Sequence, residues 1–271
     1  MHENNYLAII SYIGTNYSGW QKQKEDRLTV QEIVTKTFES LLNTKIEKVS
    51  YTGRTDKGVS ALFQYFNFYI KERINPAFYI DIVKKANMAL PSDILVLDFK
   101  NVDNSFSSRY NVKYKTYLYK IIFCDDEKIV IDKYGLYNYL LMKSYCKDYV
   151  VSKLNDFIVF FNGLRDYSSY HRPEKGVAKN TVLDLSLVYF IYDYPEFWVL
   201  TFEFKAAYFL RNMIRKIMGM FVALLEGKVD MDYIRDSFDN PDPSKGKFVS
   251  SPKPLVLYSV KYDRWLYKGA E

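Results

Sequence analysis

The first hundred residues show one order of predicted elements: strand, helix, strand, strand, helix, strand. The strand predictions rest on apolar and aromatic runs bounded by turn residues, at residues 6–13, 48–52, 62–70 and 94–99. This order matches the split βαβ unit of ferredoxin-like folds. It therefore predicts an α+β fold whose first half is built on that unit.

The two helices of this half are indicated by their spacing and by their ends. Apolar residues recur at helical intervals and form one stripe: Val30, Ile33, Val34, Phe38, Leu41 and Leu42. Thr29 and Glu32 have the spacing of a capping box, which predicts that the first helix begins there. Asn75 and Pro76 are predicted as the cap and first position of the second helix, and Pro91 ends it.

The rest of the chain repeats the broad order of the first half, although no sequence repeat is visible. Its predicted elements are a strand at 114–123, a helix at 147–161, strands at 182–192 and 197–205, helices at 208–226 and 230–238, and a strand at 255–262. Gly227 follows the long helix as its C-cap, and the proline-rich stretch 241–254 predicts a loop. We expect a boundary near residues 103–105, which gives two ferredoxin-like halves, residues 1–104 and 105–271.

Cysteine and histidine are too few for several classes of site. The chain contains two cysteines, Cys124 and Cys146, and two histidines, His2 and His171. These residues do not have metal-ligand spacing, and a disulfide framework is not expected. The sequence therefore predicts neither a metal site nor a Ser-His-Asp triad.

Charge and hydropathy favour a folded protein with a mild basic excess. The formal net charge is +6 and the sequence pI is about 8.9, which suits a polyanionic partner but is also common in proteins without one. The N-terminus lacks a basic-then-apolar signal pattern. The apolar segment 209–225 is interrupted by Arg211, Arg215 and Lys216, so we expect no membrane span. The cytoplasm is the simplest compartment.

A short polar loop, GRTDKGVSA at residues 53–61, lies between the two central predicted strands of the first half. It carries Arg54 and Asp56, two residues apart and bracketed by Gly53 and Gly58. Glycine allows a sharp turn and a close approach of a ligand to the backbone. Taken alone, Asp-x-Gly between strands is most often only a turn.

The loop resembles the catalytic loop of the TruA-type pseudouridine synthases, the family that acts on the tRNA anticodon arm. Four further segments resemble the same family in the same order: residues 14–21 ending in GWQ, residues 87–94 with their LP and Asp, residues 106–119 running from FSSRY to YLY, and residues 209–215, FLRNMIR. The five segments are spread over most of the chain, from residue 14 to residue 215, which makes the resemblance specific.

The resemblance implies an isomerase that converts uridine to pseudouridine in RNA without a cofactor or metal. Asp56 is the nucleophile or base, and Arg215 is the cation that pairs with it and keeps it ionised. Tyr117 stacks on the flipped base and helps to remove the proton from C5, and Arg54 helps to extrude the nucleotide.

Contacts with the RNA backbone are expected from basic side chains, because cations supply most of the affinity for phosphates. Arg109 and Arg211 are the substrate-binding candidates, and Arg211 is expected one turn from Arg215 on the same helix face. Further cations that could line a groove are Lys113, Lys115, Arg165, Arg172, Lys175 and Lys179.

The family also implies that the sheets of the two halves join into one mostly antiparallel sheet flanked by helices, with a central active-site cleft. It implies a homodimer that grips one tRNA. Lys57 and Ser60 depart from the commonest bacterial pattern and look more like the eukaryotic and archaeal branch. Three alternatives stay open: the same chemistry on another RNA such as rRNA, a catalytically inactive RNA-binding or chaperone homologue, and a generic ferredoxin-like interaction domain.

Overall fold

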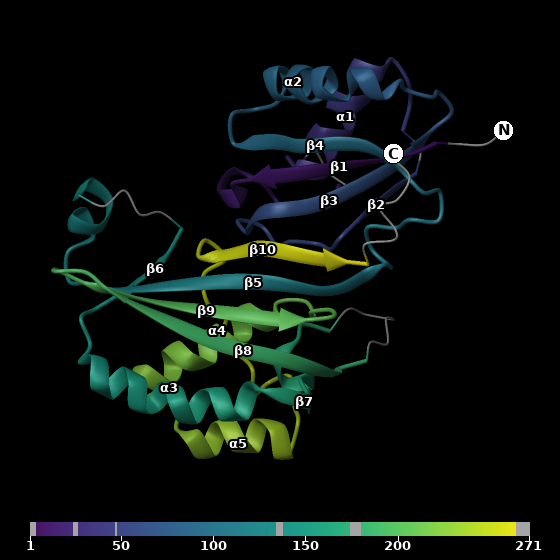
Figure 1. Cartoon of the computed structure of the whole chain (residues 1–271). Coiled ribbons are helices and arrows are strands. Elements are labelled where there is room, and N and C mark those ends of the chain that lie inside the picture. The colour runs from purple at the N-terminus through teal and green to yellow at the C-terminus, as the bar shows by residue number, and fades with distance from the viewer. Residues whose placement is uncertain (1–3, 24–26, 47, 134–137, 174–179, 264–271) are drawn as a thin grey trace. The chain divides into compact units, whose positions relative to one another are not determined.

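The computed structural model describes residues 4–23, 27–46, 48–133, 138–173 and 180–263, and it is an α+β fold (Figure 1). The α-helices are α1 (Val30–Leu42), α2 (Tyr79–Ala89), α3 (Lys147–Phe161), α4 (Met213–Leu225) and α5 (Met231–Asp239). The strands are β1 (Asn4–Tyr12), β2 (Val49–Tyr51), β3 (Ser60–Ile70), β4 (Ile94–Val102), β5 (Val112–Phe123), β6 (Leu140–Met142), β7 (Gly163–Asp166), β8 (Val182–Asp193), β9 (Trp198–Ala206) and β10 (Leu255–Tyr262).

The chain forms two compact units. Unit 1 contains residues 1–115 and 256–271, and unit 2 contains residues 116–255. Strand β10 thus returns the C-terminal end of the chain to unit 1. The division of the sequence at residue 104, and the ferredoxin-like character of each half, stay predictions.

The sheet of unit 1 has the strand order β4-β1-β3-β10, with β2 also paired to β3. Strand β1 is antiparallel to both neighbours, and β2 is antiparallel to β3. Strand β10 is parallel to β3 and pairs Val256 with Ser60 and Leu257 with Ala61. The sheet is therefore mostly antiparallel, and β10 meets β3 at the last two residues of the polar loop segment, where β3 begins.

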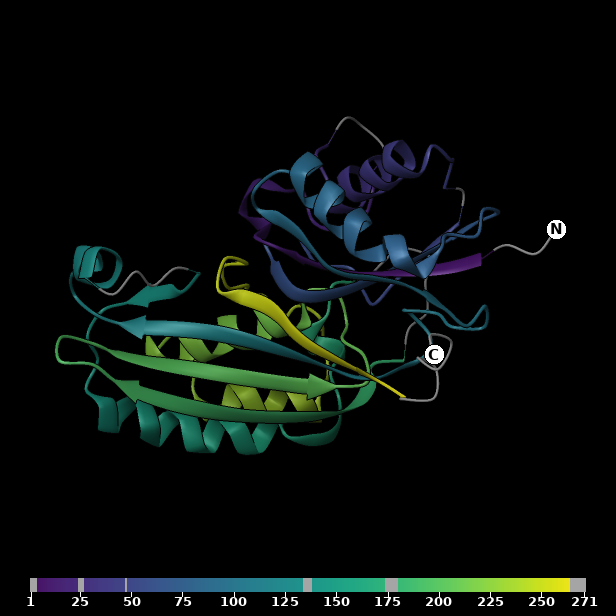
Figure 2. The ribbon, with the colours of Figure 1, turned by 45° about the horizontal axis from the view of Figure 1, so that its top comes forward.

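Helices α1 and α2 cover one face of this sheet (Figure 2). The ring of Phe38 on α1 stacks on that of Phe99 on β4 at 5.5 Å between centroids and lies 5.2 Å from that of Phe68 on β3. Tyr6 on β1 also stacks on Phe99, at 5.4 Å, and Tyr79 on α2 meets Phe99 edge-on at 5.4 Å. Burying aromatic rings supplies much of the hydrophobic stabilisation of a core, and here it packs both helices against the sheet.

The sheet of unit 2 has the order β5-β9-β8-β7, with the short β6 parallel to β5. Strand β8 is antiparallel to β7 and β9. Helices α3, α4 and α5 pack on this unit (Figure 1). Phe221 of α4 joins the layers, because its ring contacts Phe157 of α3 and Phe202 of β9, each at 5.1 Å between centroids.

The predicted strands and helices occur in the predicted order, and α3 and β10 have the predicted bounds, but the two short strands β6 and β7 were not predicted. Two details were wrong. The helix predicted over 208–226 begins only at Met213, because Asn212 has a left-handed backbone with φ 60°. The capping box is not formed, since Thr29 precedes α1 but its hydroxyl makes no cap bond. Loop carbonyls replace it: Val30 and Gln31 donate their N–H groups to the carbonyl oxygens of Gly19 and Trp20.

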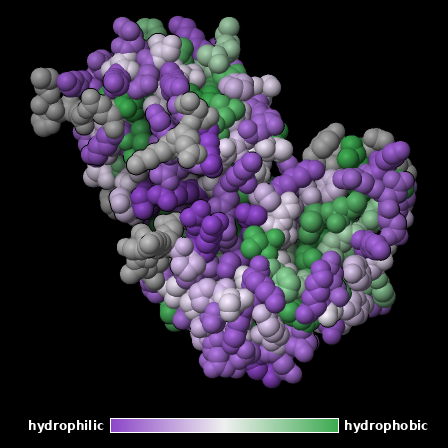
Figure 3. Space-filling view, turned by 180° about the vertical axis from the view of Figure 1, so that it is seen from behind, coloured by the Kyte–Doolittle hydropathy of each residue, from purple (hydrophilic) through white to green (hydrophobic). Residues whose placement is uncertain are grey.

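The surface is mostly hydrophilic in the view of Figure 3, with apolar side chains gathered in separate patches. Strand β8 contributes to the exposed apolar surface of unit 2 through Val188, Phe190 and Tyr192, which are 42%, 45% and 52% exposed. Within the described part of the chain, no helix combines the length and the apolar character that a membrane crossing requires.

Candidate functional site

The polar loop joins β2 to β3, and successive side chains in it differ in how far they are buried. Thr55 is buried, and its hydroxyl lies 2.8 Å from the hydroxyl of Tyr12. Asp56 is half-buried, and Arg54 is exposed. The turn closes where the N–H of Val59 donates to the carbonyl of Asp56 at 3.1 Å. The loop thus anchors itself through Thr55 and presents Arg54 at its surface.

Two glycines of the segment 14–21 allow that segment to press against the loop. A Cβ on Gly14 would lie 2.0 Å from the carbonyl oxygen of Val59, and one on Gly19 would lie 2.6 Å from the carbonyl oxygen of Thr55. Gly19 also has φ 101°, a conformation that other residues rarely adopt. The N–H of Gly14 donates to the hydroxyl of Ser60 at 3.0 Å. Only residues without a side chain permit this backbone contact.

Asp93, in the turn before β4, connects a third segment to the same assembly. Its carboxylate accepts hydrogen bonds from the hydroxyl of Tyr17 and from the amide of Asn16, the latter at 3.1 Å. Burial, reinforced by this carboxylate, raises the pKa of Tyr17. The carbonyl of Tyr17 in turn accepts from the N–H of Gly58 at 3.3 Å. Two segments distant in the sequence therefore hold the loop: residues 14–21 contact it directly, and the Asp93 turn supports those residues.

Arg109 lies on a turn that buried polar contacts also fix. The N–H of Ser108 donates to the side-chain oxygen of Asn67 at 2.8 Å, and its carbonyl accepts from the hydroxyl of Tyr262 at 2.7 Å. Arg109 itself is exposed, with its guanidinium carbon 5.5 Å from the centre of the Tyr110 ring. This turn presents a cation and an aromatic ring at the surface of unit 1.

Tyr117 belongs to unit 2 and lies on β5 on the same side as Tyr119. Its side chain is 7% exposed, and its ring meets that of Phe209 edge-on at 5.0 Å between centroids. The predicted stacking residue therefore has a ring held by packing, as a rigid platform requires.

Arg215, on α4 of unit 2, is held by the main chain of Ser250. Its Nε donates to the carbonyl of Ser250 at 2.9 Å, and the N–H of Ser250 donates to the carbonyl of Arg215 at 2.9 Å. The hydroxyl of Ser250 lies 2.5 Å from the hydroxyl of Tyr119, which also donates to the carbonyl of Ser251 at 3.2 Å. Burial raises the pKa of Tyr119 to about 12, so this tyrosine stays neutral. The direction of the guanidinium is thus set by a reciprocal main-chain pair.

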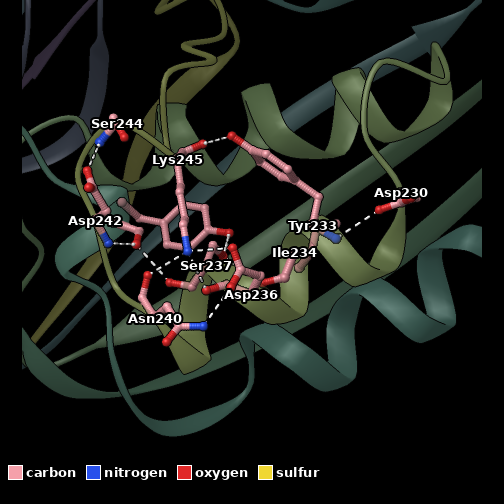
Figure 4. Close-up of polar contacts among 11 residues, drawn as sticks. Asp230, Tyr233, Ile234, Asp236, Ser237, Asn240, Asp242, Ser244 and Lys245 are labelled. Carbon is pink, nitrogen blue, oxygen red and sulfur yellow. Dashed lines mark hydrogen bonds and ion pairs between the residues drawn. The ribbon is translucent and has the colours of Figure 1, made fainter.

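Ser250 belongs to the proline-rich loop, residues 241–254, which contacts both α4 and the C-terminal end of α5. On α4, a Cβ on Gly219 would lie 2.6 Å from the carbonyl of Phe248. At the other end Lys245 donates to the carbonyls of Asp236 and Asn240, at 3.1 and 2.8 Å, and pairs with the Asp236 carboxylate (Figure 4). The sequence carries no signal for this role of Ser250, because neither contact is local.

Arg211 does not occupy the predicted position. It precedes α4, so it is not one helical turn from Arg215 on the same face. Its side chain is exposed, and its carbonyl accepts from the N–H of Arg172 at 3.0 Å. Of the predicted site residues, Arg54, Asp56 and Arg109 lie in unit 1 and Tyr117, Arg211 and Arg215 lie in unit 2.

Among the described residues, no group of three or more His, Cys, Asp or Glu side chains is arranged to hold a metal ion. Cys124 is a free, buried thiol and Cys146 a free, exposed one.

A family model described as tRNA pseudouridine synthase matches residues 8–111 and 158–263. The chain is 31% identical over 260 residues to "tRNA pseudouridine synthase A" of Thermoanaerobacter sp. (strain X514), an alignment that covers 95% of this chain and 99% of the relative. It is 32% identical over 266 residues to the protein of that name from Nitrosomonas eutropha, with coverages of 96% and 88%. The ranges matched by the family model contain the loop, Arg109 and Arg215, and Tyr117 lies between them.

We expect Gly14→Ala to destabilise the protein by about 1–3 kcal/mol, because the new methyl group must displace the backbone of Val59. Gly53→Ala is the matched control, since its methyl would meet only the end of the flexible Lys115 side chain. Thermal and urea unfolding of both variants measures the difference. Equal stability of the two variants would contradict the close-contact argument.

Proposed function

The chain belongs to the family of tRNA pseudouridine synthases and isomerises uridine in tRNA, and we propose that Asp56, Tyr117 and Arg215 carry the reaction. The observation that supports this assignment best is the bracing of the Asp56 loop by the close backbone contacts of Gly14 and Gly19. Those contacts hold a half-buried carboxylate in one place, and a preorganised geometry is what catalysis requires.

The reaction breaks the bond between C1′ of the ribose and N1 of uracil, turns the base, and joins C5 to the same carbon. The proton lost from C5 is balanced by the proton gained at N1, so no oxidant, reductant or energy source is consumed. A carboxylate that acts as nucleophile or base suffices. We assign this role to Asp56, which acts in its ionised form, and assign to Arg215 the role of keeping it ionised.

The other roles follow the same proposal. Tyr117 supplies a packed ring for stacking on the extruded base and a hydroxyl for the C5 proton step. Arg54 is exposed on the loop, as a residue that displaces a nucleotide from its stack must be. Arg109 and Arg211 are exposed cations suited to phosphates.

Three finer proposals concern the substrate and the protein's setting. The target is the anticodon arm of tRNA, as the resemblance of the five sequence segments implies. The protein works in the cytoplasm, in keeping with a tRNA substrate and with two free thiols. It acts as a homodimer, which the family resemblance implies.

Asp56→Asn is expected to lower the rate of pseudouridine formation by a factor on the order of 10⁴ and to leave RNA affinity nearly unchanged, because the amide has the carboxylate's shape but not its nucleophilicity. Asp156→Asn, an exposed position on α3, is the control. Single-turnover conversion of unmodified tRNA, with filter binding in parallel, gives both quantities. Substantial turnover by purified Asp56→Asn would defeat the assignment.

Tyr117→Phe should keep the stacking surface and slow the proton-transfer step by about 10²–10⁴-fold. Tyr117→Leu should lose both the platform and the hydroxyl, so its RNA affinity should fall as well. The comparison needs single-turnover rates and dissociation constants for the two variants. Wild-type rates in both would show that Tyr117 only packs.

Gly219→Ala tests whether the orientation of Arg215 matters for the reaction. Its methyl group would push the backbone of Phe248 and Val249 away from α4, and with it the Ser250 carbonyl that holds Arg215. A misplacement of about 1 Å can cost about 10²-fold in rate. We expect kcat to fall by that order, with KM changed little, in a variant that still unfolds cooperatively. An unchanged kcat would show that the contact with Ser250 is structural only.

A further inference from the structure

Lys115, on β5 in unit 1, reaches the backbone of the catalytic loop. A Cβ placed on Gly53 would lie 3.0 Å from the Nζ of Lys115 and 3.9 Å from its Cε. The carbonyl of Gly53 is held separately, by the side-chain amide of Gln64 at 2.7 Å. The ammonium therefore lies closely against the face of Gly53 from which a side chain would project, directly before Arg54 and Asp56.

This ammonium has no counter-charge in the part of the chain that the structure describes. Within those residues it makes no hydrogen bond or ion pair, although its side chain is half-buried. Burial, together with the like charge of Arg109, lowers the pKa of Lys115 to about 8. Lys113 on the same strand differs: its ammonium is paired with the carboxylate of Asp263 and its side chain is 55% exposed.

A partly desolvated cation beside a second cation disfavours the folded state unless an anion compensates it. The pH dependence of this cost follows from the difference in proton binding between the folded and the unfolded state. The pKa of Lys115 in the folded protein lies below its unfolded value, so the unfolded chain binds more protons between pH 8 and the ordinary lysine range, and stability rises with pH there. At neutral pH the charge of Lys115 is therefore a cost to folding. An RNA strand supplies the missing anion through its phosphodiester groups.

We propose that Lys115 is a substrate-binding residue that holds a backbone phosphate of the RNA at the catalytic loop, with Gly53 as the residue that makes room for its ammonium. The proposal rests on the proposed function and adds one contact to it. Because a phosphate carries no base identity, the contact contributes affinity and register, not sequence preference.

The experiment compares Lys115→Gln, Gly53→Ala and the control Lys113→Gln. Dissociation constants for unmodified tRNA are measured over a series of salt concentrations. We expect Lys115→Gln to weaken binding about five- to tenfold and to reduce the slope of log K against log salt by about 0.7–0.9, the value for one phosphate. Gly53→Ala should move in the same direction because it displaces the ammonium. Lys113→Gln should change the slope by less than half as much, since its charge is already paired.

Three further readouts separate binding from a structural role. A tRNA whose target uridine is replaced by cytidine should lose affinity by the same factor in Lys115→Gln, as a phosphate contact requires. The melting temperature of Lys115→Gln at pH 7 should equal or exceed that of the wild type, because the variant removes an uncompensated cation. Inorganic phosphate should compete with tRNA for the wild type more strongly than for Lys115→Gln.

Wild-type affinity and salt slope in Lys115→Gln would overturn the inference. A lowered melting temperature with unchanged affinity would overturn it as well and assign Lys115 a structural role. The proposed function has its own test: it is wrong if the wild-type protein forms no pseudouridine in tRNA. If the wild-type protein is active and Lys115→Gln has the wild-type tRNA affinity and salt slope, the Lys115 contact is rejected and the isomerase assignment stands.

Discussion

The carbonyl oxygens of Val59 and Thr55 leave no room for a Cβ at positions 14 and 19, and the placement of Asp56 depends on that contact. The loop between β2 and β3 has no regular hydrogen-bonded structure of its own, so its shape must come from neighbours. Gly14, Gly19 and the Asp93 turn supply it, mostly through main-chain groups. These contacts fix the backbone that carries the Asp56 carboxylate.

In unit 2, close backbone contacts at glycine residues also help to position a cation, Arg215. Gly219 lets the chain at Phe248 approach α4, and Gly246 lets it approach Ser169, where a Cβ would lie 1.9 Å from the carbonyl oxygen. Directly after these two close contacts, Ser250 exchanges hydrogen bonds with Arg215. Main-chain partners suit this purpose because they do not rotate, unlike a carboxylate on a flexible side chain. The loop that carries Asp56 in unit 1 and the segment that holds Arg215 in unit 2 are therefore each positioned by backbone contacts that only glycine permits.

Functional charges in such a protein need not favour folding. Lys115 is half-buried and repelled by Arg109, whereas Lys113 two residues earlier has the carboxylate of Asp263. A cation that costs stability is retained where a ligand compensates it, which is the usual relation between stability and function at binding sites. In the proposed contact, a phosphate of the RNA compensates the charge of Lys115.

Much of the architecture was predictable because its determinants are local. The apolar period of residues 147–161 and the run at 255–262 gave the bounds of α3 and β10, and the loop with Arg54 and Asp56 could be recognised from nine residues. Other features depend on contacts between distant residues. The apolar pattern before Met213 continues the helical period, yet the left-handed conformation of Asn212 ends it there and removes Arg211 from the helix. The capping box at Thr29 has the right spacing, but carbonyls of Gly19 and Trp20 reach the helix N-terminus first.

By itself, then, the sequence determined the order of strands and helices, the family and the position of the polar loop with Arg54 and Asp56, because periodicity, caps and short motifs act over a few residues. Only the tertiary structure decided that Ser250 holds Arg215, that Gly14 and Gly19 support Asp56, and that Lys115 lies over Gly53 without a counter-charge. Each of these depends on the distance between atoms that are between about 30 and 60 residues apart in the chain. Such distances are set by the packing of whole elements, which no local pattern of residues records.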